Sequence, residues 1–297
     1  MRSDRAFVGD EEISSIQRQN APISEIHSID LSGTYGISDR WSVTLTLPFS
    51  YGERSAVTEH DFVHRHTMRA SGLGDIRLVT DFWLRNPHEH ADGNVAFGLG
   101  FKAPTGEDDA TDTSHRPTGR VSRPVDPSIQ PGDGGWGIIL EMQGYQRICG
   151  NFYGYIGGYY MMTPEEQNDT EFTNADLFQG IPVWAKFNSI ADQYSGRGGV
   201  SYLWPAPALT FSFGARIDGV PVSDAIGGSL GFRNPGYAVS VEPGVAWNYK
   251  KAVMAVSIPV AVYRNRERSA VEERANLPAF AASFADFLVL ASLSFRF

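Results

Sequence analysis

The chain ends on SFADFLVLASLSFRF, Ser283 to Phe297, and no other part of the sequence says more about its fold. Every second residue, counted back from the end, is apolar: Phe297, Phe295, Leu293, Ala291, Val289, Phe287 and Ala285. The residues between them are mostly polar: Arg296, Ser294, Ser292, Leu290, Leu288 and Asp286. Period-two alternation predicts a strand with one apolar face. A soluble sheet seldom ends on its most hydrophobic strand, because a free edge promotes aggregation. The last strand of a transmembrane barrel instead pairs with the first.

The same alternation recurs in six clear segments, near residues 28–35, 42–50, 75–84, 94–102, 209–218 and 237–248. Three more stretches, around 136–147, 152–162 and 252–263, are strand-like with a less clear facing. In the clear segments the charges stay opposite the apolar face, and a Lys or Arg facing lipid would cost roughly 2–4 kcal/mol. A soluble β-sandwich would alternate in the same way, so alternation alone does not decide.

The connections between these segments favour a barrel. Short ones lie at 37–40, 149–150, 205–207 and 250–251, with one of modest length near 87–92. Long polar stretches lie between them, at about 52–70, 104–134, 164–192, 221–235 and 265–282. Short turns on one rim and long loops on the other are typical of membrane barrels. Trp41, Trp204 and Trp247 lie beside short turns, as an interfacial aromatic girdle requires.

About eleven strands can be counted, whereas bacterial barrels normally have an even number. We therefore predict an all-β, antiparallel transmembrane β-barrel of about twelve strands, with short periplasmic turns and long extracellular loops. It forms a single domain over 1–297. The first strand is expected to be incomplete, with residues 1–8 as its upper end and 9–22 as the first long loop. A segment upstream would complete it.

Composition excludes several classes of protein. No apolar run approaches the ~20 residues of a membrane helix, which excludes a helical membrane protein. The net charge of −9 argues against nucleic acid as a partner. The single cysteine, Cys149, precludes an intramolecular disulfide. Because residues 1–6 lack an apolar signal core, location in the bacterial outer membrane requires a signal peptide that was removed or truncated.

Five short motifs carry a family resemblance: YGISDR at 35–40, GLGDIR at 72–77, KAPTG at 102–106, QPGDGGW at 130–136 and NSIADQY at 188–194. From about residue 30 to its end, the chain resembles the Gram-negative outer-membrane barrels of the phenol-degradation MetA-pathway transporter family. The resemblance implies transport of small molecules across the outer membrane and a link to aromatic catabolism. It supplies no catalytic residues.

The polar faces of the predicted strands would line a pore. The predicted pore-lining residues are Asp30, Asp75, Arg77, Asp81, Glu141, Arg147, Arg197, Arg216, Asp218, Glu242 and Arg296. Such charges can orient a solute or can interlock and occlude a narrow barrel, and we favour a narrow, partly occluded pore. Our hypothesis is that Arg77, Arg216 and Glu242 line the path.

The loop from Glu165 to Asp192 is rich in apolar residues, which would form a costly patch if exposed. We expect it to fold into or over the barrel mouth as a constriction, with Phe172, Phe178, Trp184 and Phe187 as its main residues. Self-packing of a compact loop is an equal alternative.

Two loop motifs could bind metal ions. His60, His64 and His66 with Asp61 supply enough imidazoles, but nothing in a long loop fixes them, so we predict a solvated loop and no metal site. His88 and His90 should lie on the opposite rim. The acidic run 107–112 lacks the order of an EF-hand loop, and we interpret it as a hydrophilic loop.

The chain offers little that suggests an enzyme. His27 and Ser28 are adjacent, but neighbours on a strand point to opposite faces, and there is no Gly-x-Ser-x-Gly motif. We predict a channel for small, including hydrophobic or aromatic, molecules, without catalysis or cofactor. The alternatives are a lipase- or protease-like barrel enzyme and a non-conducting anchor barrel. Expected partners are outer-membrane lipid and lipopolysaccharide, a small-molecule solute, and the barrel-assembly machinery through the strand ending at Phe297.

Overall fold

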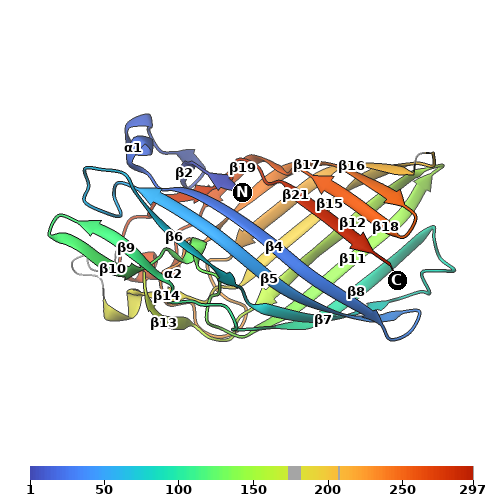
Figure 1. Ribbon diagram of the computed structural model, residues 1–297, viewed down its shortest axis with the longest axis horizontal. Coiled ribbons are helices and arrows are strands. Elements are labelled where there is room, and N and C mark those ends of the chain that lie inside the picture. Colours follow the sequence, from blue (N-terminus) through green and yellow to red (C-terminus); the bar gives the residue numbers. More distant parts are fainter. Residues whose placement is uncertain (173–181, 207, 297) are drawn as a thin grey trace.

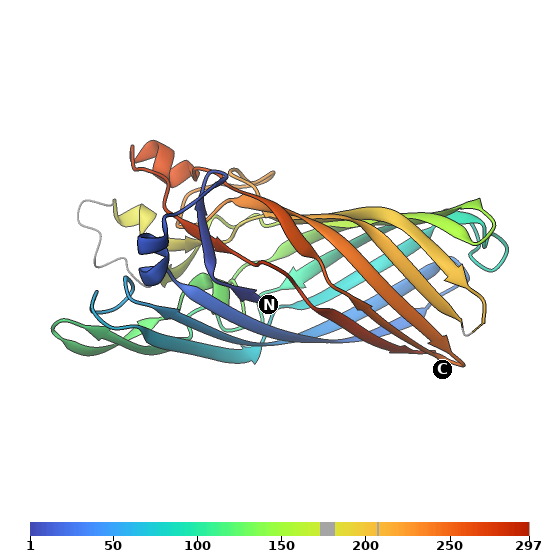
Figure 2. The ribbon, with the colours of Figure 1, turned by 90° about the horizontal axis from the view of Figure 1, so that it is seen from above.

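A computed structural model describes residues 1–172, 182–206 and 208–296. Its main feature is one antiparallel sheet that curls around a long axis (Figures 1 and 2). Twelve strands follow one another along this sheet in the described residues, as predicted. They are β1 (Arg2–Ser3), β4 (Ile23–Gly36), β5 (Trp41–Ala56), β7 (Ile76–Trp83), β8 (Gly93–Ala103), β11 (Gly137–Cys149), β12 (Phe152–Met162), β15 (Gln193–Trp204), β16 (Leu209–Val220), β17 (Gly236–Tyr249), β18 (Ala252–Ser257) and β21 (Leu290–Phe295).

Two of these strands continue beyond an interruption. β6 (His66–Leu73) and β7 both pair with β5, on either side of the break at residues 74–75. β18 and β19 (Val260–Arg266) both pair with β17, on either side of a break that contains Pro259. Proline has no N–H to donate, so it interrupts a ladder.

The remaining elements gather at the end that carries the long loops, on the left in Figure 1. They are β2 (Arg5–Val8), β3 (Glu11–Glu12), α1 (Ser15–Asn20), β9 (Thr111–Arg116), β10 (Gly119–Pro124), η1 (Pro127–Ile129), β13 (Gln167–Glu171), η2 (Val183–Ala185), β14 (Phe187–Ser189), α2 (Ala270–Arg274) and β20 (Ala282–Phe284). The opposite end carries the short turns, so the predicted asymmetry is confirmed. No helix in the described ranges has both the length and the apolar character needed to cross a bilayer.

The predicted loop at 52–70 is too long, because β5 runs to Ala56 and β6 begins at His66. The two strands pair along this whole extension, from Ala56↔His66 to Phe49↔Leu73. Their backbone N–H and C=O groups are therefore hydrogen-bonded beyond the apolar part of the main sheet. The predicted loop 104–134 likewise contains the β9–β10 hairpin.

The first strand is short. Arg2 and Ser3 pair with β4, and Arg2 also forms a bridge with Phe287, so β1 lies between the first long strand and the last. In the described residues, no ladder joins β4 directly to β21. The prediction that residues 1–8 form one barrel strand is wrong for 5–8, which pair with β3 and β20 instead. Phe7 packs edge-on against Phe284 there, with ring centroids 6.0 Å apart.

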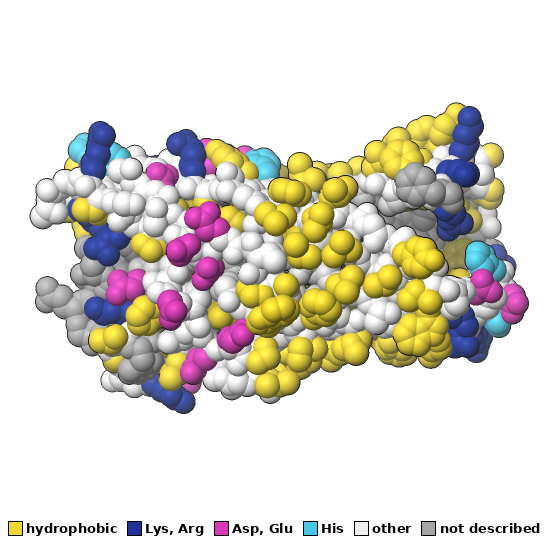
Figure 3. All heavy atoms as spheres, turned by 60° about the horizontal axis from the view of Figure 1, so that its bottom comes forward, with side chains coloured by type: hydrophobic (Ala, Val, Ile, Leu, Met, Phe, Trp, Pro, Cys, Tyr) yellow, Lys and Arg dark blue, Asp and Glu magenta, His cyan; other side chains and the backbone are white. Residues whose placement is uncertain are grey.

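The outer face of the sheet is apolar over most of its length. Figure 3 shows hydrophobic side chains in a broad band, with charged side chains towards the two ends. Exposed members of this face include Ile29, Leu31, Phe97, Leu99, Leu140, Phe213, Val262 and Leu293. Trp41, Trp204 and Trp247 are 39–50% exposed near the short turns, where the girdle prediction places them. An apolar surface of this extent is rare on a soluble monomer.

Candidate functional site: a charged lumen and its inner mouth

The strand register turns charged side chains to the inner face of the sheet. Asp30 of β4 and Arg77 of β7 form an ion pair at 2.6 Å across the intervening strand β5. Both side chains stay substantially exposed, at 46% and 37%. The pair therefore lies on the face opposite the exposed apolar side chains, and its role in lining a pore stays a prediction.

Two further carboxylates approach each other on this part of the wall. Asp81 of β7 and Glu141 of β11 lie on either side of Gly98 in β8. A Cβ atom at position 98 would lie 2.9 Å from the Asp81 Oδ1 atom and 3.0 Å from the Glu141 Cβ atom. Glycine therefore provides the room that lets both acids face inward.

A second group of charges lies on β15, β16 and β17. The Arg216 guanidinium donates to both carboxylate oxygens of Asp218, at 2.7 and 2.8 Å. Arg197 lies opposite Arg216 in the ladder, and its Nη1 atom is 3.6 Å from the Glu242 Oε1 atom. Arg197 is about half exposed, whereas Glu242 is almost fully buried and also accepts a hydrogen bond from Ser257. Most of these charges are therefore paired along the wall.

Tyr155 belongs to the same part of the wall and was missed from the sequence. A Cβ atom at Gly199 or Gly214 would lie 2.8 or 2.5 Å from its hydroxyl oxygen. The side chain thus lies flat over the glycines of two neighbouring strands instead of crossing the interior. The facing glycines were the only sequence signal of this arrangement.

Two predicted lining residues lie near the short turns. Arg147 forms an exposed ion pair with Asp92 at 2.9 Å and donates to the Tyr153 hydroxyl. Arg296 follows β21, and its backbone N–H donates to the Lys251 carbonyl.

Asp75 has a different environment from the other predicted lining residues. Its Oδ2 atom lies 3.1 Å from the Nζ atom of Lys102, which is only 3% exposed and also pairs with Asp133. The backbone N–H groups of Gly106 and Asp133 donate to the same carboxylate. We call Asp75, Lys102 and Asp133 the Lys102 cluster. Its groups satisfy one another, as buried charges must.

The Lys102 cluster joins three of the motifs that carry the family resemblance. Gly74, Gly106 and Gly132 meet there, since a Cβ atom at Gly106 would lie 2.7 Å from the Gly132 Cα atom and 3.0 Å from the Gly74 carbonyl carbon. Side chains at these positions would separate the three chain segments. The spacing of these motifs in the sequence did not reveal that they lie together.

The segment from Val125 to Gly135 folds onto the inner face of the sheet. A Cβ atom at Gly52 of β5 would collide with Ile129, and one at Gly72 of β6 would touch Pro131. Ile129 packs in a buried apolar cluster with Met68, Ala70, Ala110 and Val125. Figure 2 shows the helical turn of this segment, in green, within the outline of the sheet. The polar composition of 104–134 predicted a long loop and carried no signal of this inward course.

The predicted constriction at 165–192 is described only in part. Phe172 is buried and stacks on Phe232 of the next loop, with ring centroids 4.3 Å apart. Phe187 is half-buried, and its carbonyl accepts the backbone N–H of Phe232. Phe178 and the side chain of Trp184 lie outside the described residues. The described contacts therefore join two loops to each other, and the role of this region as a constriction stays a prediction.

A buried network connects the same two loops. Asp192 accepts hydrogen bonds from the backbone N–H groups of Thr163 and Ala225, at 2.7 and 2.8 Å. Asp224 accepts from the Asp192 N–H and pairs with Arg233, and both side chains of this ion pair are at most 2% exposed. The long-loop end is therefore an interlocked structure with its own polar core.

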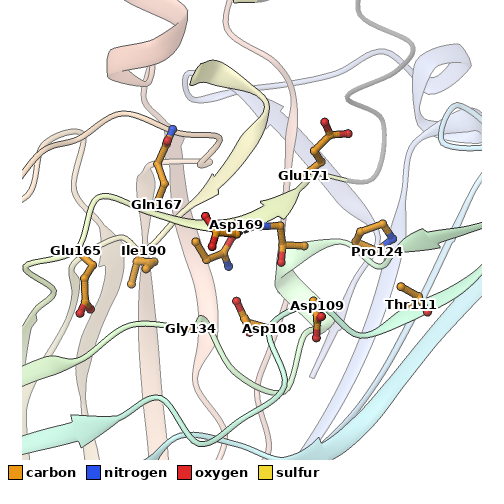
Figure 4. Close-up of a pocket in the computed structure, with 12 residues that line it drawn as sticks. Asp108, Asp109, Thr111, Pro124, Gly134, Glu165, Gln167, Asp169, Glu171 and Ile190 are labelled. Atoms are coloured by element: carbon orange, nitrogen blue, oxygen red, sulfur yellow. Dashed lines mark hydrogen bonds between the residues drawn. The ribbon is translucent and has the colours of Figure 1, made fainter. Parts of the chain in front are cut away.

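An acidic hollow of about 650 Å³ opens at this end of the molecule. Figure 4 shows Asp108 and Asp109 on one side and Gln167, Asp169 and Glu171 on the other. Burial and the neighbouring charges of Asp109, Asp75 and Asp169 raise the pKa of Asp108 above its usual range. Acidic side chains thus surround an opening close to the Lys102 cluster.

The adjacent His27 and Ser28 point away from each other. In the ladder, His27 lies opposite Tyr51 and Ser28 lies opposite Ser50, on the other face. The His27 ring contacts Glu25 at 3.1 Å. These two residues do not form the nucleophile–base pair that hydrolysis requires.

The fold of this chain recurs in other solved structures. No family model matches the chain, and no curated protein matches it. Its structure is similar to the crystal structure of an outer membrane channel from Pseudomonas putida F1, with a TM-score of 0.58 and 12% sequence identity, over 98% of this chain and 90% of that chain. The chain therefore shares the fold of that structure, an antiparallel β-sheet that curls around a long axis.

Proposed function

We propose that this protein is a bacterial outer-membrane channel for small molecules. The observation that carries the proposal is the separation of the two faces of the sheet. Leu99 and Phe213 are more than half exposed on the outer face, while Arg77, Asp81 and Arg197 face inward. Lipid on one side and water on the other are the environments that this separation suits.

The interior suits small solutes. The ion pairs Asp30–Arg77 and Arg216–Asp218 keep these charged side chains close to the inner face of the sheet. The segment 125–135 packs on the same face near the long loops and takes up part of the interior there. Tyr155 and Tyr159 add aromatic surface beside these charges. Aromatic and charged walls fit small aromatic solutes with polar substituents. Small aromatic solutes also agree with the resemblance to the phenol-degradation transporter family, and we include this substrate class in the proposal.

Conductance in planar lipid bilayers tests the proposal. Neutralising Arg77 and Arg216 together (R77Q/R216Q) should shift ion selectivity towards cations, because fixed positive charge would leave the wall. E242Q should shift selectivity in the opposite direction. The control is R120Q, on the exposed β9–β10 hairpin, which should behave as the unmodified protein does.

The outcomes separate two failures. Unchanged selectivity in a conducting R77Q/R216Q variant would show that these residues do not line the path. A folded, membrane-inserted protein that never conducts, and that does not permit swelling of liposomes in any small solute, would contradict the channel itself.

A further inference from the structure

The β5–β6 loop, residues 57–65, brings together side chains that bind transition metals. The Asp61 Oδ2 atom lies 3.1 Å from the His64 Nδ1 atom and 3.2 Å from the His66 Nε2 atom. Each of these three residues offers one ligand atom, and these atoms all lie within 4.8 Å of one another. Two imidazoles and a carboxylate at this spacing match the donor set of many zinc, nickel and copper sites.

The backbone fixes the carboxylate. The Asp61 Oδ1 atom accepts the backbone N–H groups of Val63 and His64, at 2.9 and 2.7 Å. Phe62 has a φ of +62°, a left-handed conformation that turns the chain back on itself. The Oδ2 atom is thereby directed towards the two histidine rings. The expectation that nothing in this loop fixes these residues is therefore wrong for Asp61.

The second loop at this end fixes one of the rings. His66 begins β6, and its ring stacks on that of His115 in β9 at 3.9 Å with an interplanar angle of 3°. Behind them, the buried His60 ring accepts the backbone N–H of His115 at its Nδ1 atom. His66 therefore has a packed position, whereas the His64 side chain is 73% exposed and open to solvent.

We propose that Asp61, His64 and His66 form a site for a borderline divalent transition metal such as Zn²⁺, with solvent completing the coordination. The bound ion ties the tip of the β5–β6 loop to the first residue of β6. Hard cations such as Mg²⁺ and Ca²⁺ are excluded by chemistry, because they prefer oxygen ligands. This site is independent of the proposed channel function.

Isothermal titration of the detergent-solubilised full chain with ZnCl₂ tests the site. Saturable binding of one ion is expected, with no comparable heat from MgCl₂. Substitution of both ligand histidines (H64A/H66A) should weaken binding by more than about tenfold, since loss of even an indirect partner costs 10–100-fold at metal sites. Conservative D61N should also weaken it, while retaining the acceptor for the loop N–H groups.

The chain contains a matched control for this experiment. His88 and His90 have the same spacing as His64 and His66 but lie at the short-turn end, where the described residues do not bring three ligand atoms within 4.8 Å of one another. H88A/H90A should bind Zn²⁺ as the unmodified protein does. Electron paramagnetic resonance of the unmodified protein with Cu²⁺ should show two coordinating imidazole nitrogens. Absence of saturable Zn²⁺ binding, or equal binding by H64A/H66A, would overturn the proposal.

Discussion

The wall of the sheet and the long-loop end obtain their stability in different ways. On the wall, large apolar side chains such as Leu99 and Phe213 are exposed, and backbone hydrogen bonds between neighbouring strands hold the sheet together. At the long-loop end, apolar side chains such as Val125 and Ile129 are buried, and ion pairs such as Arg233–Asp224 are excluded from solvent. The wall therefore depends on an apolar environment outside the chain, whereas the loop end depends on its own packing.

The largest effect is expected from breaking a buried ion pair at the loop end. R233A leaves the Asp224 carboxylate buried without its partner, which should lower the free energy of unfolding by about 3–5 kcal/mol. Urea unfolding of the protein in lipid vesicles, followed by tryptophan fluorescence, measures the loss. R147A at the short-turn end removes one member of an exposed pair with Asp92 and should cost less than about 1 kcal/mol. Equal losses in the two variants would contradict the comparison.

A smaller effect is expected from the inward-folded segment. I129A leaves a cavity against Gly52 and the cluster of Met68 and Ala70, at a cost of about 2–5 kcal/mol. The loosened segment should also raise the conductance of the proposed channel. Ile148 is 60% exposed on the outer face, so I148A should cost less and leave conductance unchanged. If I148A cost more than I129A, the inward packing described for Ile129 would be wrong.

The sequence was most informative for the wall, where each side chain lies either on the outer apolar face or on the inner charged face. Alternation in Val95–Phe101 and in Leu209–Ile217 identified both the strands and their facing, and the register confirms it. Alternation in segments 28–35, 75–84 and 209–218 likewise predicted that Asp30, Arg77 and Arg216 lie opposite the apolar face, because facing follows from parity alone.

The loop end could not be predicted in the same way, because its contacts join residues far apart in the chain. Asp75 lies on the inner side but is held by Lys102 and Asp133, which no periodicity connects to it. The histidine cluster depends on the left-handed turn at Phe62 and on stacking by His115 from another loop. Such positions follow from tertiary packing, and a single sequence carries little local signal of it.

In the proposed channel, neighbouring residues of one strand face lipid and lumen in turn. Met142 and Gln143 of β11 test it, because Met142 is exposed on the outer apolar face and Gln143 follows it on the inner face. In urea unfolding from lipid vesicles, M142R should lose about 2–4 kcal/mol, while Q143R should lose little. Equal losses from the two substitutions, or a protein that stays folded and monomeric in water without lipid or detergent, would contradict the account.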